Sequence, residues 1–104
     1  MVMPAKNFVE LKPEIPKRMV LTAWRWDRRA IIDPQTGKVS HKDVMEFDCS
    51  LEDGQPVEKK FSALAYKLQE QLAPEIESGR LFNRVIEITW YPRGYATDYR
   101  LRLL

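Results

Sequence analysis

The chain has 104 residues, of which 44% are hydrophobic and 11% aromatic, a composition typical of one folded domain with its own core. Its 17 basic and 15 acidic residues give a formal net charge of +2, which excludes the strong positive field of a dedicated duplex-DNA protein. A single cysteine, Cys49, excludes an internal disulfide and a cysteine-based zinc site.

The N-terminal stretch predicts an extended arm. Residues 1–18 contain three prolines and no regular hydrophobic period, and we expect a single domain to follow over residues 19–104. Phe8, Val9 and Leu11 are the candidate anchor points of this arm. Two interpretations remain open: the arm either lies over the domain or frays at the terminus, or it pairs with a partner chain.

Three strands are predicted after the arm. Strand formers dominate residues 19–32, and both faces of the first half carry apolar side chains, which predicts a bent strand buried on two sides. A turn follows at residues 33–38, where Asp-Pro and glycine occur. Residues 44–51 alternate between apolar and polar, and Asp53-Gly54 then predicts a tight hairpin into a third strand over residues 57–61.

One helix is predicted, within residues 59–78. Apolar residues recur there at every fourth position, which predicts one buried stripe: Leu64, Leu68, Leu72 and Ile76. Ser62 is the candidate N-cap, and Gly79 stands where a C-terminal cap would end the helix. Pro74 removes a hydrogen-bond donor, so we expect a kink or a break at that point.

Two further strands are predicted, over residues 84–91 and 95–104. The order of three strands, one helix and two strands is similar to the OB-fold, a five-stranded Greek-key barrel with its helix between the third and fourth strands. This resemblance covers residues 19–104, rests on element order, and implies a mainly β protein. An α+β sheet with one helix packed on its face is the alternative. OB-folds most often bind single-stranded nucleic acid, although some bind sugars or proteins.

Aromatic and basic residues are interleaved in two stretches, a pattern typical of proteins that stack unpaired bases and contact their phosphates. The first stretch is residues 24–29, and the second is residues 90–100. The OB resemblance implies that the second lies at the loop between strands four and five, with Lys38 and His41 on the other ligand-binding loop. The candidate nucleic-acid-binding residues are Trp24, Arg25, Trp26, Arg28, Arg29, Lys38, Trp90, Tyr91, Arg93, Tyr95, Tyr99 and Arg100.

Each stretch also has a purely structural interpretation. One tryptophan of the first stretch could fill the core, with its arginines solvated and Asp27 neutralising one of them. The tyrosines of the second stretch could pack locally in a hairpin. Three lysines are interpreted as parts of a solvated face: Lys59, Lys60 and Lys67.

The sequence offers no catalytic or metal-binding set. His41 is the only histidine, and no nucleophile, base and orienting group can be assembled around it from its sequence neighbours. The acidic residues lack the spacing of a calcium loop, and the glycines are scattered singly. We therefore expect no enzymatic activity, no metal and no cofactor.

The functional prediction is a small basic protein that binds single-stranded DNA or RNA with little sequence preference, through aromatic stacking and Arg/Lys phosphate contacts. The alternative is a protein-interaction or self-association module, a homo-oligomer for example, that uses the same surface, since Trp, Tyr and Arg dominate such interfaces. Salt sensitivity separates the two, because phosphate contacts release counterions. The apolar runs are too short to cross a bilayer and no secretory signal is present, so we expect no membrane partner and an intracellular, cytoplasmic location.

Overall fold

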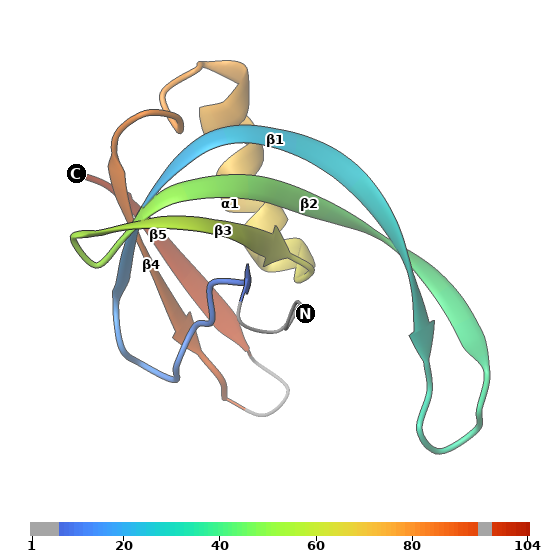
Figure 1. Cartoon of the computed structure of the whole chain (residues 1–104). Coiled ribbons are helices and arrows are strands. Elements are labelled where there is room, and N and C mark those ends of the chain that lie inside the picture. Colours follow the sequence, from blue (N-terminus) through green and yellow to red (C-terminus); the bar gives the residue numbers. More distant parts are fainter. Residues whose placement is uncertain (1–6, 94–96) are drawn as a thin grey trace.

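A computed structural model describes residues 7–93 and 97–104 of the chain; the candidate Tyr95 lies outside the described residues. Five strands and one helix follow one another in the expected order (Figure 1). They are β1 (Lys17–Ile32), β2 (Val39–Glu52), β3 (Gln55–Ala63), α1 (Tyr66–Glu77), β4 (Val85–Tyr91) and β5 (Asp98–Leu103). This confirms the mainly β class and the position of the helix between the third and fourth strands.

The strands form one antiparallel sheet in the order β3-β2-β1-β4-β5. β1 serves both halves of this sheet, because residues 17–20 pair with β4 while residues 19–32 pair with β2. The register shifts on either side of Leu21, so the predicted bend in the first strand is confirmed. Two-sided burial is wrong, since only Met19 and Leu21 of β1 are buried.

The sheet is not closed, so the expected barrel is not confirmed. β3 and β5 are its two edges, and other parts of the chain occupy both. On β5, the backbone N–H of Leu101 donates to Gln71 Oε1 of α1 at 2.9 Å, and Gln71 Nε2 donates to the carbonyl of Tyr99. On β3, the N–H of Val9 donates to the carbonyl of Lys60 at 2.8 Å. These backbone groups already have hydrogen-bond partners. Pairing of β3 with β5 would therefore add fewer new hydrogen bonds.

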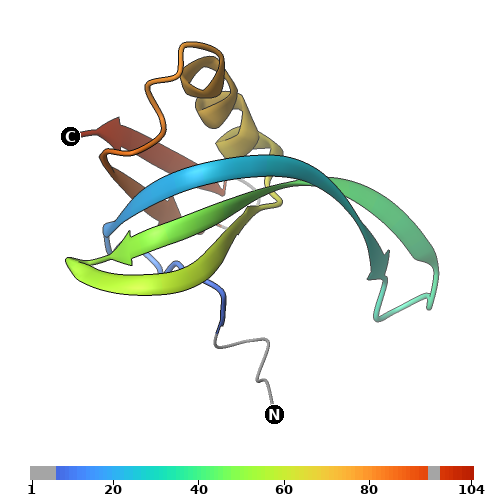
Figure 2. The ribbon, with the colours of Figure 1, turned by 45° about the horizontal axis from the view of Figure 1, so that its top comes forward.

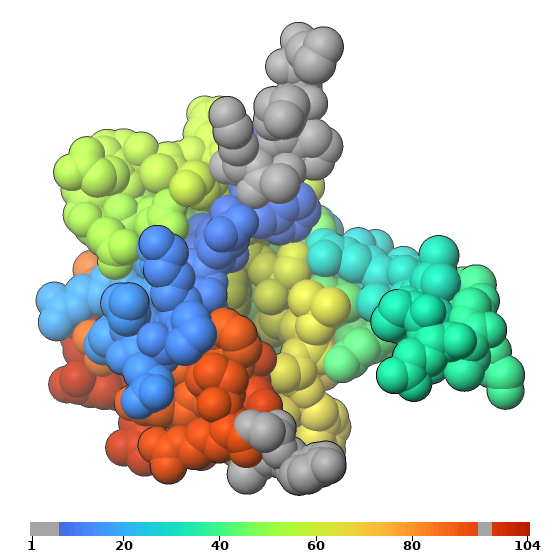
Figure 3. All heavy atoms as spheres, turned by 90° about the horizontal axis from the view of Figure 1, so that it is seen from below, coloured from blue at the N-terminus to red at the C-terminus, as the bar shows by residue number. Residues whose placement is uncertain are grey.

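The N-terminal arm packs on its own sheet. Residues 7–16 run from the edge of β3 to β4, where the N–H of Glu14 donates to the carbonyl of Trp90 at 2.8 Å (Figure 3). Val9 is buried in the core, and Leu11 packs against it. Phe8 lies beneath the guanidinium of Arg29, 5.7 Å from its ring centroid. The arm therefore contributes to the fold of its own chain.

The helix differs from the prediction at its start. It begins at Tyr66, and its N-cap residue, Ala65, makes no side-chain capping bond. The prediction of Ser62 as the cap is wrong, because pairing with β2 extends β3 to Ala63 and holds Ser62 opposite Glu46. Leu68 and Leu72 are buried as predicted, at 2% and 0% exposure, whereas Leu64 precedes the helix and Ile76 is only partly buried.

The end of the helix follows the prediction in part. The helix is not broken at Pro74, the second of the two expected outcomes there, since α1 continues to Glu77. Pro74 lies within the last turn and is exposed, so water can solvate the carbonyl that its missing N–H leaves free. The prediction that Gly79 follows the helix end is confirmed, because Gly79 has φ +74° and its N–H donates to the carbonyl of Ile76 at 3.1 Å.

Beyond the core, β1 and β2 continue together as a two-stranded projection, which we call the distal hairpin (residues 27–43). It arches out beyond the rest of the sheet (Figures 1 and 2). Every residue from 30 to 43 is exposed. The predicted turn at its tip is confirmed: the N–H of Gly37 donates to the carbonyl of Asp33 at 2.8 Å, and Gly37 has φ +71°.

Candidate nucleic-acid interface

The first candidate stretch is divided between the two faces of β1. Residues opposed in an antiparallel pair lie on the same face. Trp24 is opposite Phe47 and Trp26 is opposite Met45, so both tryptophans share the face of the core. Arg25 and Arg29 alternate with them and lie on the outer face. The aromatic and basic side chains of this stretch, although contiguous in the sequence, therefore lie on opposite faces of β1.

On the outer face, the arginines surround a buried carboxylate. Glu46 is 8% exposed and accepts from Arg25 Nε at 3.0 Å and from Arg29 Nη2 at 2.9 Å. Arg25 also pairs with Asp48 at 3.1 Å, and Arg29 pairs with Asp27 at 3.2 Å. Carboxylates therefore balance both guanidinium charges locally, which reduces their attraction for a phosphate.

The protonation of Glu46 reflects these contacts. Burial alone raises the pKa of this carboxyl group, but the hydrogen bond from Arg25, the charge of Lys60 and the hydrogen bond from Arg29 outweigh it and lower the pKa below its usual range. Glu46 is thus held as a carboxylate at neutral pH, and the cluster connects β1, β2 and β3.

The two tryptophans of β1 line an apolar groove. Their rings meet edge to face, with centroids 5.7 Å apart and planes at 75°. Trp24 is half-buried and packs against the core, whereas Trp26 is 54% exposed. The groove, which we call the tryptophan groove, has a volume of about 220 Å³ and is lined by Trp24, Trp26, Met45, Ala73, Ile76 and Glu77.

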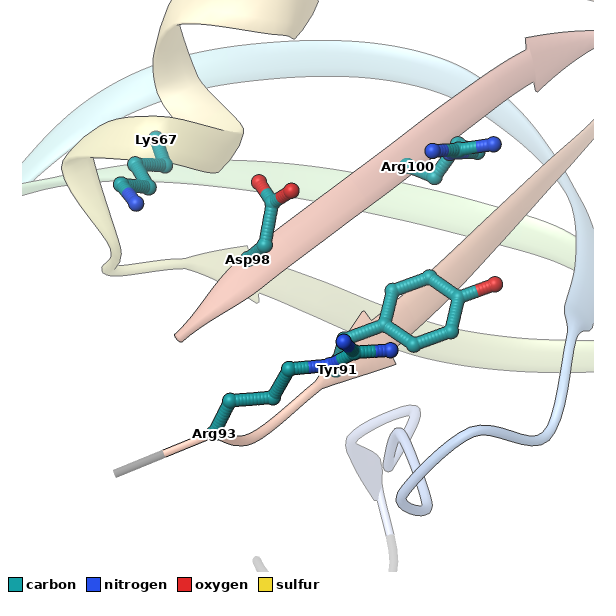
Figure 4. A pocket seen from close by; sticks show the side chains of 5 residues that line it. All are labelled: Lys67, Tyr91, Arg93, Asp98 and Arg100. Carbon is teal, nitrogen blue, oxygen red and sulfur yellow. The ribbon is translucent and has the colours of Figure 1, made fainter. Parts of the chain in front are cut away.

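The second candidate stretch contributes to a cationic pocket. This pocket has a volume of about 480 Å³ and is lined by Lys67, Tyr91, Arg93, Asp98 and Arg100. Its walls come from the first turn of α1, the end of β4 and the start of β5 (Figure 4). The guanidinium of Arg93 lies over the ring of Tyr91, 5.6 Å from its centroid, so the two form a stacked pair at the mouth of the β4–β5 hairpin.

The cationic pocket carries an excess of positive charge. Among residues 7–93 and 97–104, Lys67, Arg93 and Arg100 make no ion pair, in contrast to the neighbouring Arg102, which pairs with Glu87 at 3.1 Å. Asp98 is the one acidic residue among the described residues that line the pocket, and its carboxylate accepts from the N–H of Tyr99 at 2.9 Å. The uncapped first turn of α1 adds the positive end of a helix dipole.

The structure separates several residues that the sequence had grouped. Tyr91, Arg93 and Arg100 meet in the cationic pocket, whereas Tyr99 points toward the core, where burial raises the pKa of its hydroxyl. Trp90 is half-buried, and its indole Nε1 has no partner among the described residues. None of the described residues lines both the cationic pocket and the tryptophan groove.

The remaining candidates lie on the distal hairpin. Arg28 and Lys38 are exposed there, Arg28 on the face of Trp26 and Lys38 in the turn. Sequence reasoning missed Lys67, which it interpreted as part of a solvated face. Only the packing of α1 against β5 brings Lys67 into the lining of the cationic pocket, and no local sequence pattern encodes that placement.

No protein-family model, curated protein or solved structure matches the chain. Within the part of the chain that the structure describes, no group of three or more His, Cys, Asp or Glu residues is placed to hold a metal ion. In the same residues, no helix combines the length and the apolar character needed to cross a bilayer. The functional conclusion therefore depends on the chemistry of the cationic pocket and the tryptophan groove.

Proposed function

We propose that this protein binds single-stranded DNA or RNA, without catalysis and with little sequence preference, and that the cationic pocket holds its phosphates. One observation carries the proposal: Lys67 of α1, Arg93 after β4 and Arg100 of β5 line one recess, and none of them makes an ion pair within the described residues. Phosphates are recognised by such groups, because Lys and Arg donate charge-assisted hydrogen bonds to their oxygens.

The aromatic pair supports a single strand over a duplex. Tyr91 and the guanidinium of Arg93 present flat surfaces, on which unpaired bases stack with little regard to sequence. In a duplex the bases are already stacked on each other. A volume of about 480 Å³ is also within the usual range of small-ligand pockets, so one nucleotide is a reasonable occupant.

The sheet offers a second, weaker line of support. β1 pairs with both β2 and β4. In the chain, the helix follows β3 and precedes β4, which is the element order of the OB-fold. The cationic pocket lies at the β4–β5 end, one of the two places where OB-folds commonly hold ligands. The OB assignment remains a proposal, since the sheet is open.

The test is oligonucleotide binding by fluorescence anisotropy at several salt concentrations. We expect a short labelled single strand of mixed sequence to bind more tightly than the matching duplex. Replacing Lys67, Arg93 and Arg100 by Gln should weaken binding and reduce the salt slope by about one phosphate contact for each cation at most. The control variant replaces three cations outside the pocket, Lys12, Lys42 and Arg80, by Gln. Equal losses in the two variants would show a diffuse charge effect and contradict a site in the pocket.

A protein-binding function is favoured by other residues. The exposed apolar side chains of the hairpin region, Trp26, Ile31, Ile32 and Val39, lie outside the cationic pocket. Binding at those residues would respond weakly to salt, because no counterions are released. The two surfaces do not overlap, so one function does not exclude the other.

A further inference from the structure

The tip of the distal hairpin exposes apolar side chains. Ile32 and Val39 are directly paired across β1 and β2, and they are 65% and 57% exposed. Ile31 is 39% exposed on the other face. A two-stranded hairpin without further packing is marginally stable in water, and an apolar tip is a further cost to solubility. These side chains are therefore suited to contact another surface.

The tryptophan groove has the complementary shape and chemistry. It is a recess with mainly apolar walls, formed by two tryptophans, Met45 and the C-terminal half of α1. Trp26 remains 54% exposed at its rim. The groove opens on the same face of β1 that carries Ile32, because residues 26 and 32 are separated by an even number of positions.

The tip cannot fill the groove of its own chain. Ile32 lies six residues beyond Trp26 along the same strand, which places it roughly 20 Å away at the rise of a β-strand. A second copy of the chain has the same tip and the same groove. If a two-fold axis relates the two copies, the tip of each copy reaches the groove of the other copy. All tips and grooves are then occupied in a dimer, and no further copy can be added through them.

Charge favours the same arrangement. Lys38 is adjacent to Val39 at the tip, and Glu77 lines the groove. Glu70 lies seven residues before Glu77, on the same side of α1. Among the described residues, none of these three side chains has an ion pair. Asp33 lies opposite Lys38 at the tip, but its carboxylate accepts from the N–H groups of Gln35 and Thr36. Lys38 is therefore the tip charge that would meet the acidic rim.

We infer that the distal hairpin is an exchange arm, which inserts Ile32 and Val39 into the tryptophan groove of a second copy while Lys38 approaches Glu77. Two copies thus bury two identical contacts. The nucleic-acid proposal is independent of this inference, because the cationic pocket contributes no residue to it.

The test measures molar mass by sedimentation and light scattering over a range of protein concentrations. The wild-type chain should reach the mass of a dimer, and Ile32→Asp with Val39→Asp should give a monomer. Ile15→Asp is the control, because Ile15 is 58% exposed and lies outside the hairpin. A circular dichroism spectrum should show that all variants are folded. A wild-type chain that remains monomeric, or a dimer that the double variant does not weaken, would overturn the inference.

Charge reversal tests the reciprocal contact. Lys38→Glu or Glu77→Lys alone should raise the dissociation constant of the dimer by about tenfold, because like charges meet twice in each dimer. Mixing the two single variants should restore wild-type affinity, since the mixed dimer has an opposite pair in both contacts. The double variant should also recover. A mixture no tighter than the single variants would refute the exchange, and the Gln variant of the cationic pocket should dimerise normally.

Discussion

Gln71 of α1 and Leu101 of β5 are joined by a hydrogen bond of 2.9 Å from the backbone N–H of Leu101 to the side-chain oxygen of Gln71. The side-chain nitrogen of Gln71 donates to the carbonyl of Tyr99. One glutamine thus supplies a donor and an acceptor to the edge of β5, as a neighbouring strand would. This contact joins the helix to β5, an edge strand of the open sheet.

Replacing Gln71 by Ala should destabilise the fold by roughly 1–3 kcal/mol, because two partly buried backbone groups of β5 lose their partner. Urea denaturation gives the free energy of unfolding directly. Glu70→Ala, at the exposed neighbouring position, is the control and should leave the midpoint nearly unchanged. Equal midpoints for the two variants would mean that Gln71 does not support the edge.

The buried face of α1 gives a second prediction. Leu68 is 2% exposed and belongs to the core cluster, so Leu68→Ala should leave a cavity and cost roughly 2–5 kcal/mol. Tyr66→Ala is a matched control on the same helix, because Tyr66 is 70% exposed. Thermal melts followed by circular dichroism compare the two. A Leu68→Ala melt at the wild-type temperature would be incompatible with a buried stripe.

Features of this structure were predictable where they depend on residues close together in the sequence. The Asp53-Gly54 turn was predictable because both residues adopt positive φ, 48° and 82°, which their sequence favours. The stripe of Leu68 and Leu72 follows from helical period alone. The start of α1 was not predictable from a local cap, because pairing with β2 holds Ser62 in β3.

The candidate site was predictable only in part, for the same reason. Tyr91, Arg93 and Arg100 are close in the sequence and line one pocket, since a short hairpin brings them together. The neutralisation of Arg25 and Arg29 depends on the register that places Glu46 between them, and a sequence does not reveal its register. Lys67 joins the cluster through the packing of α1 on β5, a contact between elements far apart in the chain.

The Glu46 cluster predicts a pH dependence of stability. The pKa of Glu46 is lower in the folded chain than in the unfolded one, so its contribution is fully present above the ordinary carboxyl pKa of about 4.3 and is lost as the pH falls through the folded value. Glu46→Gln should therefore cost roughly 1–3 kcal/mol at neutral pH and much less in acid. Denaturant melts at several pH values give the free energy of unfolding of Glu46→Gln and of the wild type for this comparison.

The control for that experiment is Glu58→Gln, at an exposed position of β3. Acid sensitivity should not vanish entirely in Glu46→Gln. Burial alone raises the pKa of Glu52, but its hydrogen bonds with Lys17 and Lys59 outweigh this and lower it, so Glu52 loses stabilisation in the same direction. A Glu46→Gln variant with the wild-type pH profile would show that the cluster does not stabilise the fold.

Tyr91 allows stacking to be measured separately from charge. Replacing it by Leu removes the aromatic surface of the cationic pocket but no charge. The affinity for a single-stranded oligonucleotide should fall by roughly 1–3 kcal/mol, the usual contribution of one stacked base, while the salt slope stays that of the wild type. Tyr66→Leu, which removes an exposed tyrosine outside the pocket, is the matched control. If both variants bind as the wild type does, bases do not stack on Tyr91, and the pocket would have to act on phosphates alone.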